Sequence, residues 1–290
     1  MLFNDFLLKI LPDNLKEDLL IDENALKNIR EIRLRIGKKP IAVCYGKEIV
    51  GNYDVTEKLI GRILSLATSY SVYAFESNIS KGYLTIKGGH RIGVGGQVIW
   101  EDGRVKNFSH ITFLCIRVAR QIPGCADYIM DKFFSDELRH TIIISPPGFG
   151  KTTILRDVVK QISDKRHMNV SLIDERSEIA ACINGVPQND IGMRTDVIDG
   201  CEKSVAVYMA VRALSPQVIA MDEIGGKADV AAIRYSMKSG CIVIGTAHGT
   251  GIDDTDKELK NLFGEGGFTR AVILKKCGEV GECLDLLEDC

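Results

Sequence analysis

One glycine-rich stretch holds the residues of this sequence best suited to bind phosphate. It runs from Ser145 to Thr153 and reads S-P-P-G-F-G-K-T-T. Gly148 and Gly150 would let the backbone approach an anion and point N–H groups at it. Lys151 would reach the β- and γ-phosphates of a nucleotide, and the Thr152 hydroxyl would ligate Mg²⁺. We therefore predict that ATP and Mg²⁺ bind here, in contact with Pro147, Gly148, Phe149, Gly150, Lys151, Thr152 and Thr153.

One position departs from the phosphate-loop motif G-x-x-x-x-G-K-[ST], because Ser145 replaces its first glycine. The rest of the motif is intact, so we expect the loop to bind phosphate, with an altered backbone where the chain enters it. The alternative is a glycine-rich turn with a chance lysine. The flanks favour the phosphate site: the β-branched run 141–144 precedes the loop, and a helical pattern follows it. That helix would direct its positive dipole end at the phosphates.

Two carboxylates end a second apolar run, residues 218–221. Asp222 could hold Mg²⁺ through water, and Glu223 could polarise the water that attacks the γ-phosphate. The alternative is a helix N-cap, because glycines and a helical pattern follow. A spacing of about seventy residues from the phosphate loop favours the catalytic interpretation.

Polar residues also end two other predicted strands. Ligands bind at the carboxyl ends of parallel strands, so we predict that Glu175 and His248 act in catalysis together with Lys151 and Glu223. Other roles stay open. Asp174 could be the second catalytic carboxylate, or either acid could pair with the following arginine. His248 could sense the γ-phosphate or join the strand tips by hydrogen bonds.

Several arginines are further candidates. A basic cluster lies in and after the strand predicted at 29–36, either as a solvated sheet face or as a contact for an anionic partner. Its members are Arg30, Arg33, Arg35, Lys38 and Lys39. Arg194 and Arg212 could stabilise developing charge or could be surface residues.

Two types of pattern divide the chain. Residues 1–122 mix helices with hairpins and predict an α+β domain; residues 123–290, after the Pro123-Gly124 boundary, alternate strands and helices and predict an α/β layer fold. In the first part we expect helices at 1–11, from 55 (with Asp54 and Glu57 as a capping box) and at 72–80, and strands at 29–36, 41–45, 83–87, 90–99, 104–108 and 111–119. In the second part we expect strands at 141–145, 170–173, 216–221, 241–246 and 270–276, and helices from 151, at 202–214 and at 227–238.

Composition excludes several classes of protein. With 45% hydrophobic and 26% charged residues and a net charge of −2, the 290-residue chain is typical of a globular protein and is no bulk polyanion binder. We expect no membrane insertion and no signal peptide, and hence a cytosolic protein. The nine cysteines are odd in number and lack C-x-x-C, which favours reduced thiols. Cys277, Cys283 and Cys290 lack the histidine partners of a metal site.

The motifs together resemble the secretion ATPases of type II and type IV machines. The stretches SPPGFGKTT, LIDERSEI, VIAMDEIG and GTAHG are similar to that family's Walker A loop, acidic box, Walker B strand and histidine box. The Walker B strand of the family often ends in Gly-Glu, so Glu223 takes the glutamate position here. The resemblance implies a RecA-like P-loop ATPase domain preceded by a smaller α+β domain.

A narrower resemblance extends from about residue 29 to 280, to the stage III sporulation protein AA family of endospore-forming bacteria. It is carried by IREIRLRIGKKP, KGYLTIKGGHRIGVGG, SPPGFGKTTILRD, LIDERSEIAA and MDEIGG. It implies a mother-cell ATPase at the cytosolic base of a channel to the forespore, bound to the channel's integral membrane proteins. It also implies a homo-hexameric ring in which arginines reach nucleotide at the seam; Arg33, Arg35, Arg91 and Arg117 are candidates.

The sequence leaves three alternative functions open. The first is a motor ATPase whose two domains hinge near Pro123. The second is a nucleic-acid-translocating or nucleic-acid-binding P-loop ATPase, motivated by the basic cluster but disfavoured by the net charge and few aromatics. The third is a small-molecule kinase, which usually needs an arginine-rich lid, whereas residues 249–269 are acidic and rich in glycine.

Overall fold

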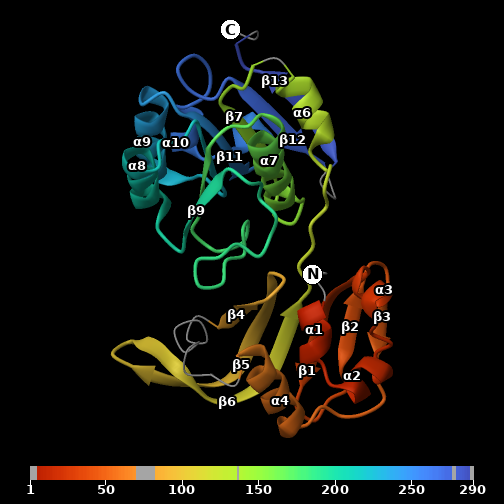
Figure 1. Ribbon diagram of the computed structural model, residues 1–290. Helices are drawn as coiled ribbons and strands as arrows, with labels where there is room; N and C mark the ends of the chain where they lie inside the picture. The colour runs from red at the N-terminus through yellow and green to blue at the C-terminus, as the bar shows by residue number, and fades with distance from the viewer. Residues whose placement is uncertain (1–4, 70–81, 136, 276–278, 288–290) are drawn as a thin grey trace. The chain divides into compact units, whose positions relative to one another are not determined.

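The computed structural model describes residues 5–69, 82–135, 137–275 and 279–287 (Figure 1). The chain divides into two compact units, Met1–Arg120 and Gln121–Cys290, and each unit has its own hydrophobic core. The helix predicted at 72–80 and two of the C-terminal cysteines, Cys277 and Cys290, lie outside the described residues.

The first unit is built on a six-stranded antiparallel sheet with the order β3-β2-β1-β6-β5-β4. Its strands are β1 (Ile29–Arg35), β2 (Ile41–Cys44), β3 (Glu48–Val50), β4 (Tyr83–Ile86), β5 (His90–Glu101) and β6 (Arg104–Arg117). The helices described in this unit are α1 (Asp5–Ile10), α2 (Asp13–Asp18), α3 (Glu23–Leu26) and α4 (Glu57–Ala67).

Polar and apolar residues alternate along β1, and this alternation gives the sheet one buried face. Ile32 and Leu34 are fully buried. Leu7 of α1 and Ile63 of α4 belong to the same core. The predicted N-terminal helix therefore packs against its own unit.

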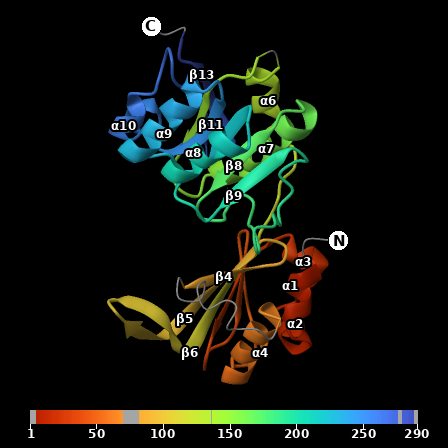
Figure 2. The same ribbon diagram turned by 60° about the vertical axis from the view of Figure 1, so that its left-hand side comes forward.

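Strands β5 and β6 continue past the other strands as a two-stranded ribbon (Figures 1 and 2). Asp102 and Gly103 make its turn in the left-handed region, with φ of 51° and 75°. The sequence predicted two strands where β6 is one. Register shifts in its ladder with β5 absorb the irregular residues, so the pairing continues through them.

The start of α4 also differs from the prediction. Thr56 is the N-cap, and its side chain accepts the N–H of Leu59 at 3.2 Å. Asp54 lies two residues too early for this role, so the predicted capping box is wrong.

The second unit contains a seven-stranded sheet with the order β13-β12-β7-β11-β10-β8-β9. All its pairings are parallel except that of β13 with β12. The strands are β7 (Thr141–Ser145), β8 (Val170–Asp174), β9 (Thr195–Asp199), β10 (Val218–Met221), β11 (Ile242–His248), β12 (Arg270–Leu274) and β13 (Val280–Asp285). The helices described are α6 (Asp127–Phe133), α7 (Lys151–Lys165), α8 (Lys203–Ala213), α9 (Gly226–Lys238) and α10 (Lys257–Lys260).

Helices cover both faces of this sheet, so its central strands are buried on both sides (Figure 2). Ile143 of β7 faces the core shared with α6 and α7. Its neighbours Ile142 and Ile144 face the core shared with α8, α9 and α10. This arrangement confirms the predicted α/β layer fold, whose strands read as continuous apolar runs.

Two strands of this sheet were not predicted. β9 lies at one edge beside β8, and its sequence Thr-Asp-Val-Ile-Asp contains only two apolar residues. β13 lies at the other edge, antiparallel to β12. In the described part of the chain, no helix has the length and apolar content needed to cross a bilayer.

Candidate active site

The candidate site lies in the second unit, where the carboxyl ends of four parallel strands lie side by side. His248, the last residue of β11, pairs with Ser145, the last residue of β7. Met221 of β10 pairs with Gly245 of β11 and with Ile173 of β8. Residues that follow these strands therefore meet although they lie far apart in the sequence.

The glycine-rich loop connects β7 to α7 at this edge. Gly148 and Gly150 have φ of +77° and +95°, in the left-handed region that favours glycine. A Cβ at Gly148 would contact nothing within 4 Å, so backbone conformation rather than crowding requires glycine there. Pro147 is exposed and Phe149 is half-buried. The loop therefore presents backbone at the N-terminus of α7, a favourable place for an anion.

Lys151 is the first residue of α7, and its side chain folds back along the loop. It is 6% exposed. Its ammonium donates to the carbonyl oxygens of Ser145 (2.8 Å) and Pro146 (3.1 Å) and lies 3.2 Å from Nδ1 of His248. Burial lowers the pKa of Lys151, while Asp222 and Glu223 oppose that shift. The structure therefore brings Lys151 and the two acids together as the sequence predicted.

Thr152 and Asp222 form a pair of oxygen ligands. The Thr152 hydroxyl donates to Oδ2 of Asp222 at 2.6 Å. The Thr246 hydroxyl donates to the other oxygen, Oδ1. Oxygen donors of this kind suit Mg²⁺, which is commonly held by a carboxylate together with a nucleotide's phosphates. The residues present therefore fit the predicted metal.

Glu223 follows Asp222, and its position is fixed at the backbone and at the carboxylate. Its φ of 50° is unusual for a residue with a side chain. Its N–H donates to the Thr246 hydroxyl at 2.9 Å. Oε1 lies 3.1 Å from Nε2 of His248, and Oε2 lies 2.5 Å from Nη1 of Arg176. His248 thus contacts Lys151 on one side of its ring and Glu223 on the other.

The two acids at the end of β8 have different surroundings. Asp174 is 2% exposed and accepts the N–H groups of Glu178, Ile179 and Ala180 at 2.8–3.0 Å. Burial raises its pKa, and these three bonds oppose the shift. Asp174 therefore organises the turn after β8.

Glu175 accepts from Lys203 at 2.6 Å and lines a small pocket with Asp222 and Glu223. The ion pair described for Arg176 is with Glu223.

Two other candidate arginines lie away from this edge. Arg194 directly precedes β9, where Thr195 pairs with Val170 at the start of β8. Arg212 is in the last turn of α8, just before β10 begins. Both therefore sit at the amino ends of the parallel strands, and neither can stabilise charge at the site of its own chain.

In the predicted basic cluster, Arg30, Arg33 and Arg35 belong to β1 in the sheet of the first unit, and Lys38 and Lys39 follow that strand. Arg33 and Arg35 of β1 lie opposite Cys115 and Phe113 of β6, and Arg91 of β5 lies opposite Arg117. Residues paired in this way share a face, here the one away from the core. Three of these arginines contact residues of the same sheet. Arg33 pairs with Glu31 at 2.5 Å, Arg35 lies over Phe113 at 5.1 Å, and Arg91 lies over Tyr83 at 3.7 Å.

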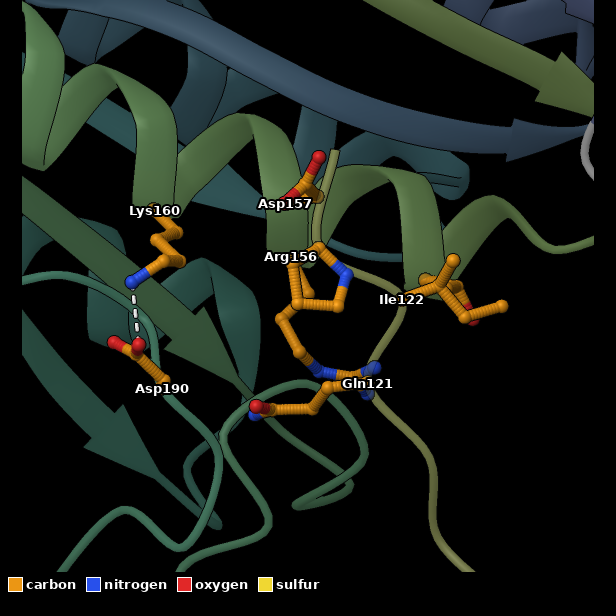
Figure 3. Close-up of a pocket in the computed structure, with 8 residues that line it drawn as sticks. Gln121, Ile122, Arg156, Asp157, Lys160 and Asp190 are labelled. Carbon is orange, nitrogen blue, oxygen red and sulfur yellow. Dashed lines mark hydrogen bonds and ion pairs between the residues drawn. The ribbon is translucent and has the colours of Figure 1, made fainter. Parts of the chain in front are cut away.

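A second pocket adjoins the C-terminal end of the loop (Figure 3). One wall is a stripe of α7 with helical spacing that starts at Thr153. The lining residues are Gln121, Ile122, Pro123, Thr153, Arg156, Asp157, Lys160 and Asp190.

Fixed polar groups shape this pocket. The Arg156 guanidinium donates to the carbonyl of Ile179 at 2.6 Å, and Asp157 accepts the N–H of Ala126 at 2.9 Å. Lys160 pairs with Asp190 across it (Figure 3). Nε2 of Gln121 is buried, and no hydrogen-bond partner for it occurs among the residues the structure describes. In the sequence, Gln121 and Ile122 attracted attention only as neighbours of the Pro123-Gly124 boundary.

Sequence reasoning also missed two residues of the site itself. Thr246 contacts both acids after β10, and Arg176 neutralises Glu223. A polar strand end was the available signal for Thr246. No sequence signal distinguishes Glu223 from the nearer acids as the partner of Arg176.

Comparison with known proteins shows the family to which the chain belongs. The model of the sporulation stage III, protein AA family matches residues 4–289. The Bacillus subtilis stage III sporulation protein AA is 38% identical over 96% of this chain and 94% of its own length. The Arabidopsis thaliana protein SEEDLING PLASTID DEVELOPMENT 1 is 28% identical over 90% of this chain, but over 36% of its own length.

Solved structures share the fold at low identity. The ATPase DotB of Yersinia pseudotuberculosis has a TM-score of 0.58 and 14% identity, covering 96% of this chain and 80% of its own. The pilus retraction motor PilT has a TM-score of 0.54 and 17% identity, covering 80% of this chain and 67% of its own. These neighbours confirm the predicted RecA-like P-loop fold with an N-terminal domain. By its sequence, the chain belongs to the sporulation stage III protein AA family.

Proposed function

We propose that the protein is an ATPase that hydrolyses ATP to ADP and phosphate at the carboxyl edge of β7, β8, β10 and β11. The observation that carries this proposal is the convergence of Lys151, Thr152, Asp222 and Glu223 on one edge from two distant segments. A phosphate loop and a pair of strand-end carboxylates are the two parts that phosphoryl transfer to water requires.

Each residue has a definite role in this proposal. The loop N–H groups and Lys151 bind the β- and γ-phosphates, and Thr152 and Asp222 hold Mg²⁺. The metal neutralises phosphate charge when bound. Glu223 accepts a hydrogen bond from the attacking water. The new bond joins the water oxygen to the γ-phosphorus while the bond to the β,γ-bridging oxygen breaks, and the water's proton leaves through Glu223 to the phosphate product.

The pocket beside Thr153 is the proposed place for the nucleotide base. It begins one residue after Thr152, on the first turns of the helix that receives the phosphates. The buried amide of Gln121 supplies a donor for a ring nitrogen, since its Nε2 has no other partner among the described residues. A nucleotide could then lie from the loop toward Gln121.

Membership in the family motivates the cellular role. We propose a mother-cell protein at the cytosolic face of a membrane complex, where its ATPase drives a secretion-like channel to the forespore. A homo-hexamer bound to integral membrane proteins of that channel is the proposed assembly. The arginines on the exposed sheet face, Arg33, Arg35, Arg91 and Arg117, are the proposed contacts to nucleotide held by a neighbouring copy.

The test is ATP hydrolysis by the purified chain with Lys151→Ala. We expect a loss of about a hundredfold or more in rate, the usual effect of removing a group that stabilises transition-state charge. Lys165→Ala is the matched control, because that lysine lies at the other end of α7. A Lys151 variant as active as wild type would overturn the site.

The nucleic-acid alternative gains no support from the contacts of the arginines in the basic cluster, which are with Glu31, Tyr45 and Phe113 of the same unit. Affinity for DNA or RNA that falls steeply with salt would revive it. A phosphorylated small molecule formed from ATP would support a kinase instead.

A further inference from the structure

The candidate base Glu223 is held on both oxygens by other side chains. Oε2 is 2.5 Å from the Arg176 guanidinium, and Oε1 is 3.1 Å from the His248 ring. Its backbone is fixed as well, since its N–H donates to Thr246 and to its neighbour Asp222. Only the side-chain torsions of Glu223 can bring its carboxylate elsewhere.

The hydrogen bonds continue from Glu223 to the phosphate loop. An ammonium group has three donors and no acceptor. Lys151 directs these donors to two carbonyl oxygens and to Nδ1 of His248. With the ammonium as donor at Nδ1, Nε2 faces Oε1 of Glu223 at hydrogen-bond distance. The His248 ring thus links Lys151 to Glu223.

These contacts restrain Glu223, the candidate base. A carboxylate whose oxygens already accept from a cation and an N–H group is a weaker acceptor for a water proton. The Arg176 side chain is 64% exposed, so it can leave Glu223 without becoming a buried unpaired charge. The side chain that can release Glu223 most readily is thus Arg176.

We propose that Arg176 is an autoinhibitory clamp on Glu223, which holds the carboxylate away from the attacking water until bound nucleotide draws Lys151 from His248. This proposal rests on the ATPase function proposed above. Phosphate oxygens carry charge and accept more strongly than a carbonyl or an imidazole, so they compete well for Lys151. Once Lys151 moves, the His248 ring loses its described contact at Nδ1, and the ion pair of Glu223 with the exposed Arg176 remains.

A positioning role would have the opposite signature. If Arg176 aims Glu223 at the water, removing the arginine slows hydrolysis; if Arg176 restrains Glu223, removing it speeds hydrolysis. An exposed ion pair shifts an equilibrium by about two- to fivefold. We therefore expect Arg176→Ala to raise kcat for ATP by about that factor with KM unchanged. Arg176→Lys, which keeps the cation, should lie nearer wild type.

The experiment uses the full chain with Mg²⁺-ATP and measures kcat, KM and, separately, equilibrium binding of a fluorescent ATP analogue. Arg139→Ala is the matched control, because Arg139 pairs with Glu137 and Asp285 on another part of the unit. The double variant with Glu223→Gln must abolish the gain. A gain that survives in that background overturns the clamp.

A kcat for Arg176→Ala equal to or below that of wild type overturns the clamp while leaving the ATPase proposal standing. Nucleotide binding without hydrolysis in both wild type and the variant overturns the ATPase proposal, and the clamp with it. Loss of analogue binding on Lys151→Ala with retention in Arg176→Ala supports both proposals. Failure of wild type to bind the analogue overturns the ATPase proposal, and the clamp with it.

Discussion

At the scale of single residues, neighbouring carboxylates differ through their partners. Asp174 and Asp222 both end buried strands. Asp174 accepts only backbone N–H groups in the hydrogen bonds described, whereas Asp222 accepts from the hydroxyls of Thr152 and Thr246. Asp174 thus serves the fold, and Asp222 is placed to serve a cation.

Asp174→Ala should destabilise the second unit. It leaves three N–H groups without an acceptor, and one such buried group costs about 1–3 kcal/mol. We expect a loss of at least about 2 kcal/mol in the free energy of unfolding, measured with urea. Asp131→Ala, at an exposed position on α6, is the control. Equal stability of the two variants would contradict this account.

Residue types predicted much of the candidate site, whereas their contacts could not be read from the sequence. Lys151, Thr152, Asp222 and Glu223 were recognisable because phosphate and magnesium chemistry restricts which residues can act. The partners of Arg176 and Thr246 depend on which strands become neighbours in the sheet. Such pairings across strands leave no local trace in the sequence.

At the scale of elements, the central strands of the second unit were predictable and the edge strands were not. β7, β8 and β10 are buried along their whole length, so their sequences are continuous apolar runs. β9 is only partly buried at the sheet edge, and β3 has three residues. Strands of this kind are held by ladder hydrogen bonds, which any residue except proline can donate.

The carboxylate of Asp164 in α7 forms a hydrogen bond with the segment before β9. Asp164 accepts the N–H of Met193 at 2.8 Å and pairs with Lys160 at 3.2 Å. The bond from Met193, together with Lys160, lowers the pKa of Asp164 below its usual 3.8 although burial opposes this. A lowered folded-state pKa stabilises the protein above pH ~4, and this contribution is lost as the pH falls through the folded-state pKa.

Asp164→Asn should therefore reduce stability at pH 7 and have a smaller effect near pH 3. The side chain is 37% exposed, so screening limits the difference to less than about 1 kcal/mol. Urea unfolding of both proteins at the two pH values measures it. A difference that does not change with pH would show that the charge of Asp164 is not responsible.

At the scale of the whole molecule, the two units follow from two sequence patterns. Alternating hairpins produce the antiparallel sheet, and alternating strands and helices produce the parallel one. The sequence pattern changes at Pro123, and the chain passes from the first compact unit to the second between Arg120 and Gln121. Gln121 itself lines the pocket beside the phosphate loop, so the linker contributes to the second unit.

If arginines of one copy complete the site of another, specific activity should depend on protein concentration. We expect the rate per chain to fall on dilution, because copies that separate lose the charges that face the nucleotide. Measuring hydrolysis over a thousandfold dilution tests this, with Arg117→Ala as the variant and the exposed Arg212→Ala as its control. A constant rate per chain would contradict a shared site.

The ribbon made by the ends of β5 and β6 carries Trp100, the single tryptophan of the chain, with 65% of its surface exposed. Indole fluorescence of the unlabelled protein therefore originates from one known place. Any molecule that binds to the ribbon and covers Trp100 should protect the indole ring from a collisional quencher such as acrylamide. The native sequence thus supplies an optical probe for partners of its first unit, without labels or substitutions.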